Sequence, residues 1–533
     1  MKAYLLYEDR DFDWNAELNP EAADLVRDLG LDILFDAMAD ADAFLRDTAR
    51  HVTLAPLAGP DAIVYRQQVL HDWLRHPDVL LDIYRLVIQA IAEERRIWPS
   101  FLRSPDSVMR RAVQAMELFT GQLRKLRQIG DEHAGDMQSP GLARFFTMLQ
   151  SELDDAYFAT VADHLRRLQF KNGVLVSAEL GHGCKGMKYV LCRPGPKPGW
   201  RERLTGGSPP AHTYRVPDRD EAGSHALFEL RDRGLNLAAD ALARSADHIL
   251  SFFTTLAREL GFYVACLKLH QKLAAKGEPR CFPTPLPVGR SSLACRGLYD
   301  TCLSLRREQR VIGNDVDADG VPLVVITGAN EGGKSTFLRS LGLAQLMMQA
   351  GLFVSADTFA ADVRTRLFTH HRREEDAEME SGKLDEELAR MSDIANRVTP
   401  GAVVLFNESF AATNEREGSE IGRQITRALL ESGVKVILVT HLYDLAHSLH
   451  ERPPEQGAVF LRAQRQADGK RTFRLEVGEP LPTSFGEDLY QNVFGEPARP
   501  SRPAGTSQEG ASPGPEGGAV SDRCPASRRS ASS

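Results

Sequence analysis

Cysteine is scarce in this chain and is not arranged for bonding. Seven cysteines occur among 533 residues, and they never form a C-x-x-C pair. Their odd number and scattered positions argue against a disulfide framework and give no support to a zinc site. We therefore expect a cytoplasmic protein that works in a reducing compartment.

Long apolar runs and basic character are also missing. No segment approaches the ~18 consecutive apolar residues that span a bilayer, so we expect no membrane-embedded part. Acidic residues appear as early as Glu8 and Asp9, which predicts that there is no secretory signal peptide. The formal net charge of −8 argues against a protein that coats nucleic acid through its overall charge. An apolar share of 42% is ordinary for a soluble chain with a substantial core.

The apolar pattern changes three times along the chain. Helical spacing dominates from about 20 to 170 and again from about 222 to 277, whereas short β-prone runs between 173 and 192 predict a hairpin or small sheet. We therefore predict a multidomain α and α/β protein. Its expected parts are a helical core or lever region (1–172), a small β-rich insertion (173–216), the second part of the helical region (217–285), an α/β nucleotide-binding domain (286–496) and a disordered tail (497–533).

Three short apolar runs, at 323–326, 403–406 and 434–439, have the form of buried strands. Helical patterns separate them, which is typical of a largely parallel sheet with crossover helices. Ligands bind such sheets at the carboxyl ends of the strands. The residues that follow each run are therefore the candidates for a functional site.

A phosphate-binding loop follows the first of these runs. Residues 328–336 fit the pattern G-x-x-x-x-G-K-[ST] and lead directly into a helical segment. Backbone N–H groups and a helix N-terminus favour phosphate there, while the lysine reaches the β- and γ-phosphates and the serine hydroxyl reaches Mg²⁺. The predicted ligands are ATP and Mg²⁺. The predicted nucleotide-binding residues are Gly328, Ala329, Asn330, Glu331, Gly332, Gly333, Lys334, Ser335 and Thr336.

Polar residues also follow the other two strands. Asn407 and Glu408 end the second, and we predict that Glu408 orients or activates water while Asn407 assists Ser335 at the metal. An amide brings no negative charge, so weak metal binding or slow turnover is expected. His441 follows the third strand and is predicted beside the γ-phosphate, although a histidine there also suits a capping or packing role.

Beyond single motifs, residues 323–447 resemble the ATPase domain of the MutS proteins of DNA mismatch repair. The stretch 327–336, TGANEGGKST, is similar to the family's T-G-P-N-M-G-G-K-S-T, and Thr440-His441 matches a T-H pair that ends a later strand. In the helical half, Arg66, Trp73-Leu74 and Pro77 follow the family's R-x-x-x-L-x-x-W-L-x-x-P pattern. The resemblance implies an ABC-type P-loop NTPase domain.

The resemblance also implies partners. MutS-like proteins sandwich ATP between two protomers and act on DNA, so a homodimer through the ATPase domain and double-stranded or branched DNA are expected. Ser381 or Gly382 falls where the family's signature serine reaches the partner's nucleotide.

Two departures from the family stand beside these matches. Only about 60 residues precede the helical pattern, so a short form without the mismatch-recognition and connector domains is expected. The segment 407–410, NESF, replaces the start of the usual D-E-x-G-R-G-T.

Three functions remain open from the sequence. The preferred one is an ATP-gated dimeric clamp, with ATPase activity, that binds DNA in repair or recombination. The alternative is a nucleotide-gated protein-interaction scaffold with slow hydrolysis and no DNA contact, which the amide at position 407 and the acidic charge favour. A transporter-type ATPase subunit is weaker, because it would leave the long helical region unexplained.

Overall fold

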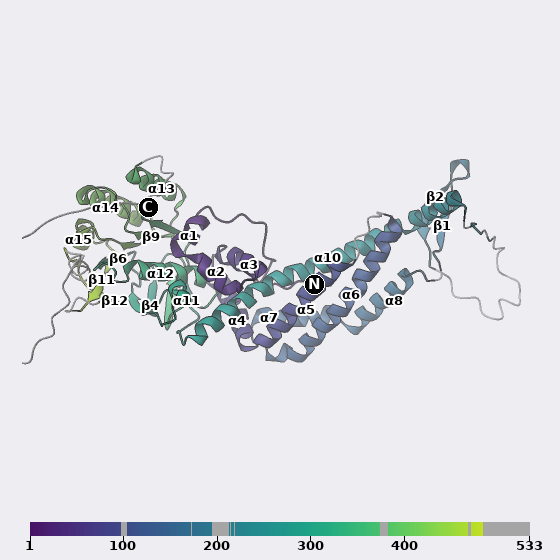
Figure 1. Cartoon of the computed structure of the whole chain (residues 1–533), viewed down its shortest axis with the longest axis horizontal. Coiled ribbons are helices and arrows are strands. Elements are labelled where there is room, and N and C mark those ends of the chain that lie inside the picture. Colours follow the sequence, from purple (N-terminus) through teal and green to yellow (C-terminus); the bar gives the residue numbers. More distant parts are fainter. Residues whose placement is uncertain are drawn as a thin grey trace, which may run out of the picture. The chain divides into compact units, whose positions relative to one another are not determined.

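The computed structural model describes residues 1–97, 104–171, 173–193, 213, 215–217, 219–373, 382–466 and 471–482. Residues 1–486 form one unit by their internal contacts (Figure 1). The predicted tail and Ser381 lie outside the described residues. The predicted domain limits stay predictions. Strand β3 (Thr284–Leu286) spans one of them, the boundary at 285/286.

Helices make up the first part of the chain, as the spacing of apolar residues predicts. Four of them begin at a proline, where the missing N–H is not needed and the ring fixes a helical φ. Pro77 accordingly opens a new helix directly after another ends at Arg75. The helices are α1 (Ala22–Leu29), α2 (Leu31–Ala39), α3 (Ala43–Thr53), α4 (Pro60–Arg75), α5 (Pro77–Arg96), α6 (Pro105–His133), α7 (Pro140–Glu152) and α8 (Asp155–Leu168).

Helix α10 (Glu221–Ala275), 55 residues long, is the central helix of this helical part. It runs beside α5 and α6 and also contacts α2 and α3 (Figure 1). Phe253 of α10 packs on Phe119 of α6 with ring centroids 5.6 Å apart. Within the described residues α10 is the one helix whose length and composition would suit a membrane span, but 72% of its most apolar window is buried. Its apolar side chains are therefore explained by packing in the core.

The predicted hairpin forms at the N-terminal end of α10. Strands β1 (Val176–Leu180) and β2 (Gly186–Leu191) pair antiparallel, and both contact α10. Several apolar side chains here remain exposed, among them Leu180 and Val190.

The first residues of the chain form neither helix nor strand and pack between α4 and α10. The backbone of Leu5 accepts a hydrogen bond from the Tyr263 hydroxyl (2.5 Å), and its N–H donates to the Glu259 carboxylate (2.9 Å). The Arg66 guanidinium of α4 donates to Leu6 O (3.1 Å). Since these partners are all buried, the segment is part of the core.

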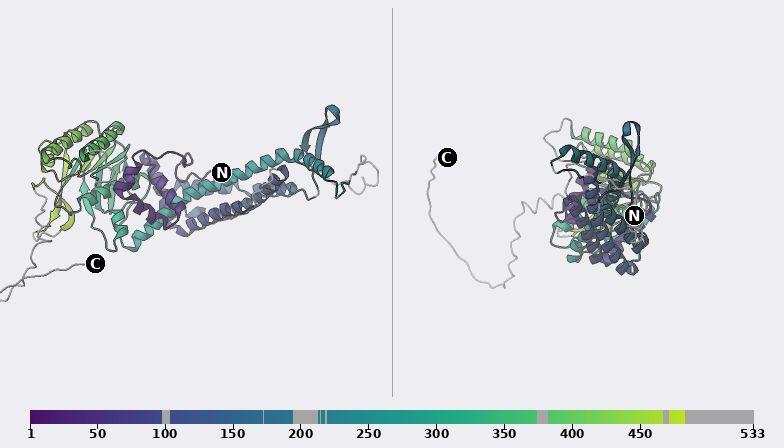
Figure 2. Two further views of the ribbon diagram at one scale, coloured as in Figure 1. Left: turned by 45° about the horizontal axis from the view of Figure 1, so that its top comes forward. Right: turned by 90° about the vertical axis from the view of Figure 1, so that its right-hand side faces the viewer.

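A six-stranded sheet, with the order β12-β11-β6-β10-β9-β8, forms the centre of the C-terminal part. Figure 2 shows the C-terminal part, in green, from two further sides. The three predicted strands are confirmed as β6 (Leu323–Gly328), β9 (Val403–Asn407) and β10 (Lys435–Val439), and they run parallel. The other strands are β8 (Leu367–His371), parallel to β9, β11 (Ala458–Arg465), parallel to β6, and β12 (Arg471–Val477), antiparallel to β11.

Each face of this sheet belongs to a different apolar cluster, because side chains alternate along a strand. Leu405 and Ile437 pack with helix α12 (Lys334–Gln349), and through it with the helical part. Val404 and Val436 pack with α14 (Glu415–Glu431) and α15 (Tyr443–Glu451) on the other face. The sheet is therefore buried on both sides, as a parallel sheet requires.

The sequence analysis did not predict a four-stranded sheet that accompanies the six-stranded one. Strands β3, β7 (Thr358–Asp362), β4 (Leu293–Leu298) and β5 (Asn314–Asp317) pair in the order β3-β7-β4-β5. The described part also contains α11 (Thr301–Arg306) and α13 (Lys383–Arg397). These strands are short, and β4 is irregular at its pairing with β5, so none gives a long alternating signal.

Candidate functional site

The carboxyl ends of four neighbouring strands meet in one row. The strand register aligns Ile326 of β6 with Val439 of β10, Val439 with Asn407 of β9, and Asn407 with His371 of β8. Neighbouring strands lie ~4.8 Å apart, so the residues just beyond the row are brought together. These are the phosphate loop, Thr440-His441, Glu408 and Arg372.

The loop after β6 has a backbone that only certain residues tolerate. Gly328 has φ +103° and Gly333 has φ +89°, both in the left-handed region that favours glycine. A Cβ on Gly328 would also come 2.8 Å from the backbone nitrogen of Ala463 in β11. Helix α12 begins immediately afterwards at Lys334, so its first free N–H groups face the loop. The loop and helix together form a site that suits phosphate.

Lys334 is buried and bends back onto its own loop. Its ammonium donates to Gly328 O (2.9 Å) and Ala329 O (3.0 Å), and the residue is 5% exposed. Burial lowers the pKa of this ammonium, while the nearby Glu408 carboxylate acts in the opposite direction. An anion placed at the loop would compensate the buried charge.

The two residues predicted to assist a metal, Ser335 and Asn407, are in direct contact with each other. The Ser335 hydroxyl donates to Asn407 Oδ1 at 2.7 Å. Among the residues that the structure describes, no group of three or more His, Cys, Asp or Glu side chains could hold a metal ion. A cation here would therefore depend on neutral oxygens of the protein and on the oxygens of a bound phosphate.

The turn after β9 holds Glu408 in an unusual conformation. Glu408 has φ +54° and Phe410 has φ +63°, and neither is glycine. The Glu408 N–H donates to Val439 O (2.9 Å), and the Phe410 N–H donates to the Glu387 carboxylate of α13 (2.9 Å). These bonds fix the direction of Glu408 against strain of order 1–3 kcal/mol per left-handed residue.

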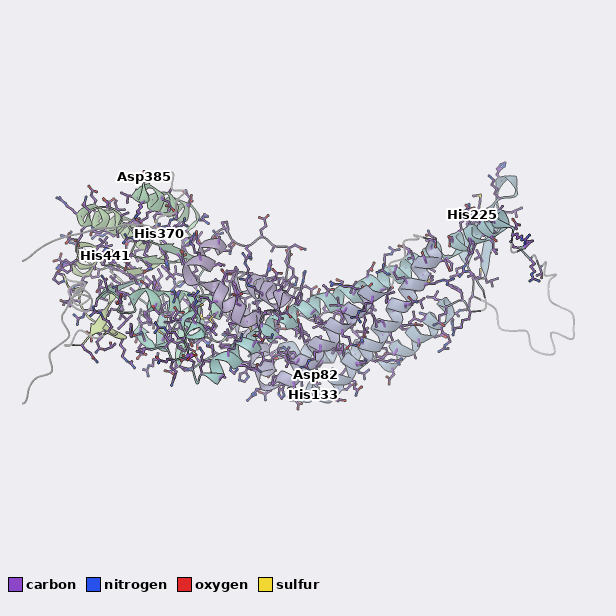
Figure 3. The ribbon with its side chains drawn as sticks, viewed as in Figure 1. Asp82, His133, His225, His370, Asp385 and His441 are labelled. Atoms are coloured by element: carbon purple, nitrogen blue, oxygen red, sulfur yellow. The ribbon has the colours of Figure 1, made fainter. Side chains whose placement is uncertain are left out.

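Below this turn lies a buried histidine. Nδ1 of His370 is 2.7 Å from the Ser409 hydroxyl, which in turn donates to His370 O (2.6 Å). Burial lowers the pKa of His370 to about 4, so the ring is neutral at physiological pH. Figure 3 shows His370 and His441 in the same C-terminal part of the chain. His370 supports the turn, whereas His441 is exposed at the strand end.

A cavity of about 730 Å³ opens over this row of strand ends. Such a volume is typical of small-molecule sites. Most of the predicted residues line it: Asn330, Glu331, Gly332, Gly333, Lys334, Ser335, Thr336, Glu408 and His441. The other three predicted residues do not line the cavity but contact residues that do. Gly328 and Ala329 accept hydrogen bonds from Lys334, and Asn407 accepts one from Ser335.

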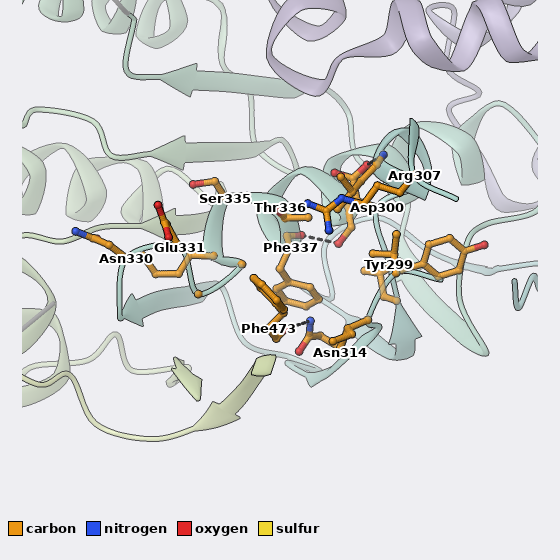
Figure 4. A pocket seen from close by; sticks show the side chains of 18 of the residues that line it. Tyr299, Asp300, Arg307, Asn314, Asn330, Glu331, Ser335, Thr336, Phe337 and Phe473 are labelled. Carbon is orange, nitrogen blue, oxygen red and sulfur yellow. Dashed lines mark hydrogen bonds between the residues drawn. The ribbon is translucent and has the colours of Figure 1, made fainter. Parts of the chain in front are cut away.

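The far end of the cavity was not predicted. Figure 4 shows Tyr299 and Arg307 across the cavity from Asn330, with Phe473 and Asn314 close to each other on one side. Asn314 Nδ2 donates to Phe473 O (3.0 Å), which joins β5 to β12. These residues come from sequence-distant segments without a shared motif. No sequence signal would have found them.

Of the two residues predicted to reach a partner's nucleotide, Ser381 and Gly382, the structure describes Gly382. Gly382 is the N-cap residue of α13. This helix packs on β8, beside the turn that carries Glu408.

Family models match both halves of the chain. Residues 58–276 match the model described as the MutS2 N-terminal domain, and residues 324–487 match MutS domain V. The chain belongs to the MutS family. The second match contains the phosphate loop, Arg372, Glu408 and His441, and the first contains the Arg66 to Pro77 pattern.

Curated relatives of this MutS-family chain carry two names. The DNA mismatch repair protein MutS of Syntrophomonas wolfei is 29% identical over 219 residues, 38% of this chain and 25% of the relative. Endonuclease MutS2 of Geobacillus kaustophilus is 30% identical over 176 residues, 32% of this chain and 22% of the relative. Endonuclease MutS2 of Thermus thermophilus is 32% identical over 161 residues, 30% of this chain and 21% of the relative. The matches span only about a quarter or a fifth of each relative's length.

Proposed function

We propose that this chain binds and hydrolyses ATP and acts on DNA in repair or recombination, as a dimeric clamp whose grip follows its nucleotide state. One observation carries the nucleotide part: the phosphate loop, Glu408 and His441 line one cavity at the ends of parallel strands. The DNA and dimer parts draw on membership of the MutS family.

The two ends of the cavity suit the two ends of ATP. The loop side offers N–H groups, the Lys334 ammonium and the Ser335 hydroxyl to the phosphates. The opposite side offers the exposed side chains of Ile312 and Phe473 as surfaces for a purine. On binding, the Lys334 ammonium would exchange loop carbonyls for phosphate oxygens.

Hydrolysis in this site depends on position and charge rather than on covalent chemistry. The backbone of Glu408 is fixed at the end of β9, so its carboxylate would enter the cavity there and orient a water molecule, and His441 would contribute its imidazole beside the terminal phosphate. Ser335 and Asn407 are the residues that would hold Mg²⁺, which supplies charge neutralisation to the phosphates when bound. Because Asn407 is uncharged, we expect slow turnover.

A route from the nucleotide to the helical part exists along α12. This helix begins at Lys334, and Gln349 at its end accepts from Leu57 N (2.8 Å) and donates to Leu57 O (3.2 Å). The Arg66 guanidinium donates to Ala350 O (3.1 Å). A shift of the loop would therefore reach α4 directly, which is the coupling that a nucleotide-gated clamp needs.

Calorimetry with the full chain tests the nucleotide part. ATP with MgCl₂ should give a heat of association, and the absence of any heat would overturn the proposal. Chromatography with light scattering, with and without ATP, tests the dimer.

Fluorescence anisotropy tests the DNA part with labelled intact and branched duplexes. Affinity should fall steeply between about 50 and 200 mM salt, because phosphate contacts release counterions. ATP binding without any DNA binding would favour the second candidate, a nucleotide-gated interaction scaffold. The observation in favour of that candidate is the neutral Ser335–Asn407 pair, which weakens metal-dependent hydrolysis.

A further inference from the structure

Arg372 lies at the phosphate end of the cavity, although no motif points to it. It follows the last residue of β8, and its N–H donates to Asn407 O at 3.0 Å. Its backbone is thereby fixed one strand away from Asn407, whose amide holds Ser335. Arg372 lines the same cavity as Lys334, Glu408 and His441.

The neighbouring arginines are engaged elsewhere, whereas Arg372 is not. Arg373 pairs with Asp24 (3.0 Å) and Glu386 (3.1 Å), and Arg390 donates to His371 O (2.8 Å). Within the described residues, the guanidinium of Arg372 makes no hydrogen bond or ion pair, and the residue is exposed. A cation is therefore available at the open end of the row.

The charges around this position favour an anion. Asn407 supplies no negative charge. Among the described residues that line the cavity, the carboxylates are Asp300, Glu331 and Glu408, and the cations are Arg307, Arg310, Lys334 and Arg372. Asp300 is already paired with Arg339, so cations outnumber the remaining carboxylates. Burial raises the pKa of Glu387 in α13, and the positive charge of Arg372 acts against that rise. Arginine binds phosphate oxygens in a forked geometry and keeps its charge under all ordinary conditions. The geometry fits a terminal phosphate that projects from the loop toward Glu408 and β8.

We propose that Arg372 binds the γ-phosphate of ATP within its own protomer and so distinguishes nucleoside triphosphate from diphosphate. This inference rests on the proposed function, since it assumes ATP at the loop. The uncharged Asn407 would hold a divalent cation weakly, and the arginine would supply part of the missing positive charge at the phosphates. ATP binding should accordingly persist when Mg²⁺ is removed.

The test compares ATP and ADP affinity by calorimetry, in MgCl₂ and in EDTA, for the full chain and three variants. Arg372→Ala should weaken ATP binding by about tenfold or more while ADP affinity stays the same, as expected for loss of a charge-assisted hydrogen bond. Arg372→Lys should retain part of the preference. Arg373→Ala is the matched control, because its side chain lies outside the cavity lining and should leave the preference unchanged.

The outcomes separate this inference from the proposed function. Normal ATP binding with an unchanged ATP-to-ADP preference in Arg372→Ala would overturn the inference alone. Absence of ATP binding by the unaltered chain would overturn the proposed function and the inference with it. A loss of preference that appears only at protein concentrations where the chain dimerises would assign the arginine to the partner's nucleotide, and would overturn its assignment within one protomer. Retained ADP affinity shows that the variants are folded.

Discussion

Glu259 is a carboxyl group buried in the middle of α10, and it makes a sharp test of the packing around the N-terminal segment. It is completely buried, and one oxygen accepts the Leu5 N–H at 2.9 Å. The other oxygen has no hydrogen-bond partner among the described residues. Burial raises the pKa of Glu259 from 4.5 to about 8, and the nearby charges of Arg66 and Lys2 only partly oppose that rise.

Because its pKa is raised, the Glu259 carboxyl is harder to ionise in the folded state than in the unfolded state. The fold is therefore more stable while this group is protonated. The folded state binds more protons than the unfolded state between pH 4.5 and pH 8, so stability falls as the pH rises through that range. Each tenfold change in the proton-binding equilibrium corresponds to about 1.36 kcal/mol, so Glu259 should account for a loss of about 4 kcal/mol between these two pH values. Glu259→Gln cannot titrate and should lose this part of the pH dependence.

Chemical denaturation followed by circular dichroism at pH 5, 6, 7 and 8 measures the effect. The difference in unfolding free energy between the unaltered chain and Glu259→Gln should change by several kcal/mol in favour of the variant as the pH rises. Glu229→Gln is the control on the same helix, because Glu229 is exposed and pairs with Arg233 (2.7 Å). Parallel pH profiles for the unaltered chain and Glu259→Gln would refute the reasoning.

Three further substitutions test the site and its connection to the helices. Lys334→Ala should weaken ATP binding by about a hundredfold, since a buried cation at the phosphates is lost; calorimetry with normal affinity would contradict the loop assignment. Glu408→Gln should retain ATP affinity but slow phosphate release in a turnover assay by about a hundredfold, and unchanged turnover would mean that another residue handles the water. Gly351→Ala should destabilise the fold by about 2 kcal/mol or more, because Gly351 has φ +77° and a Cβ would come 2.8 Å from the Arg66 side chain. Gly277→Ala is its control in thermal unfolding, with a similar φ of +66° but open space around the Cβ.

The sequence predicted the parts of the site that share one local pattern. A buried strand followed by polar residues is visible in the chain itself, and it led to Lys334, Glu408 and His441. The parallel register then brings these strand ends together by the ordinary geometry of α/β sheets. The contact between Ser335 and Asn407 follows from that register and from the position of α12.

The remaining wall of the cavity depends on geometry that has no local signal. Phe473 has φ +58° and reaches the cavity from an antiparallel strand that Asn314 holds in place. Arg372 lies past the end of an edge strand, and its place at the cavity appears only when Asn407 is known to lie beside it. The chain order of these residues says nothing of their proximity, because two separate sheets bring them together.

Arg66 explains why the helical pattern and the phosphate loop belong to one protein. Its guanidinium is fully buried and donates to Leu6 O in the N-terminal segment and to Ala350 O at the end of α12. A buried arginine is costly unless hydrogen bonds compensate for its lost hydration, and Nη2 of Arg66 has no partner among the described residues. Its place in the core therefore depends on the bonds that it does make, including the one to Ala350 O at the end of α12. Gly351 allows the close approach, since any larger residue would meet the arginine stem. The arginine of the pattern therefore connects α4 to the helix that begins at Lys334, and a motion of the loop that displaced α12 would have to break this contact or move α4 with it.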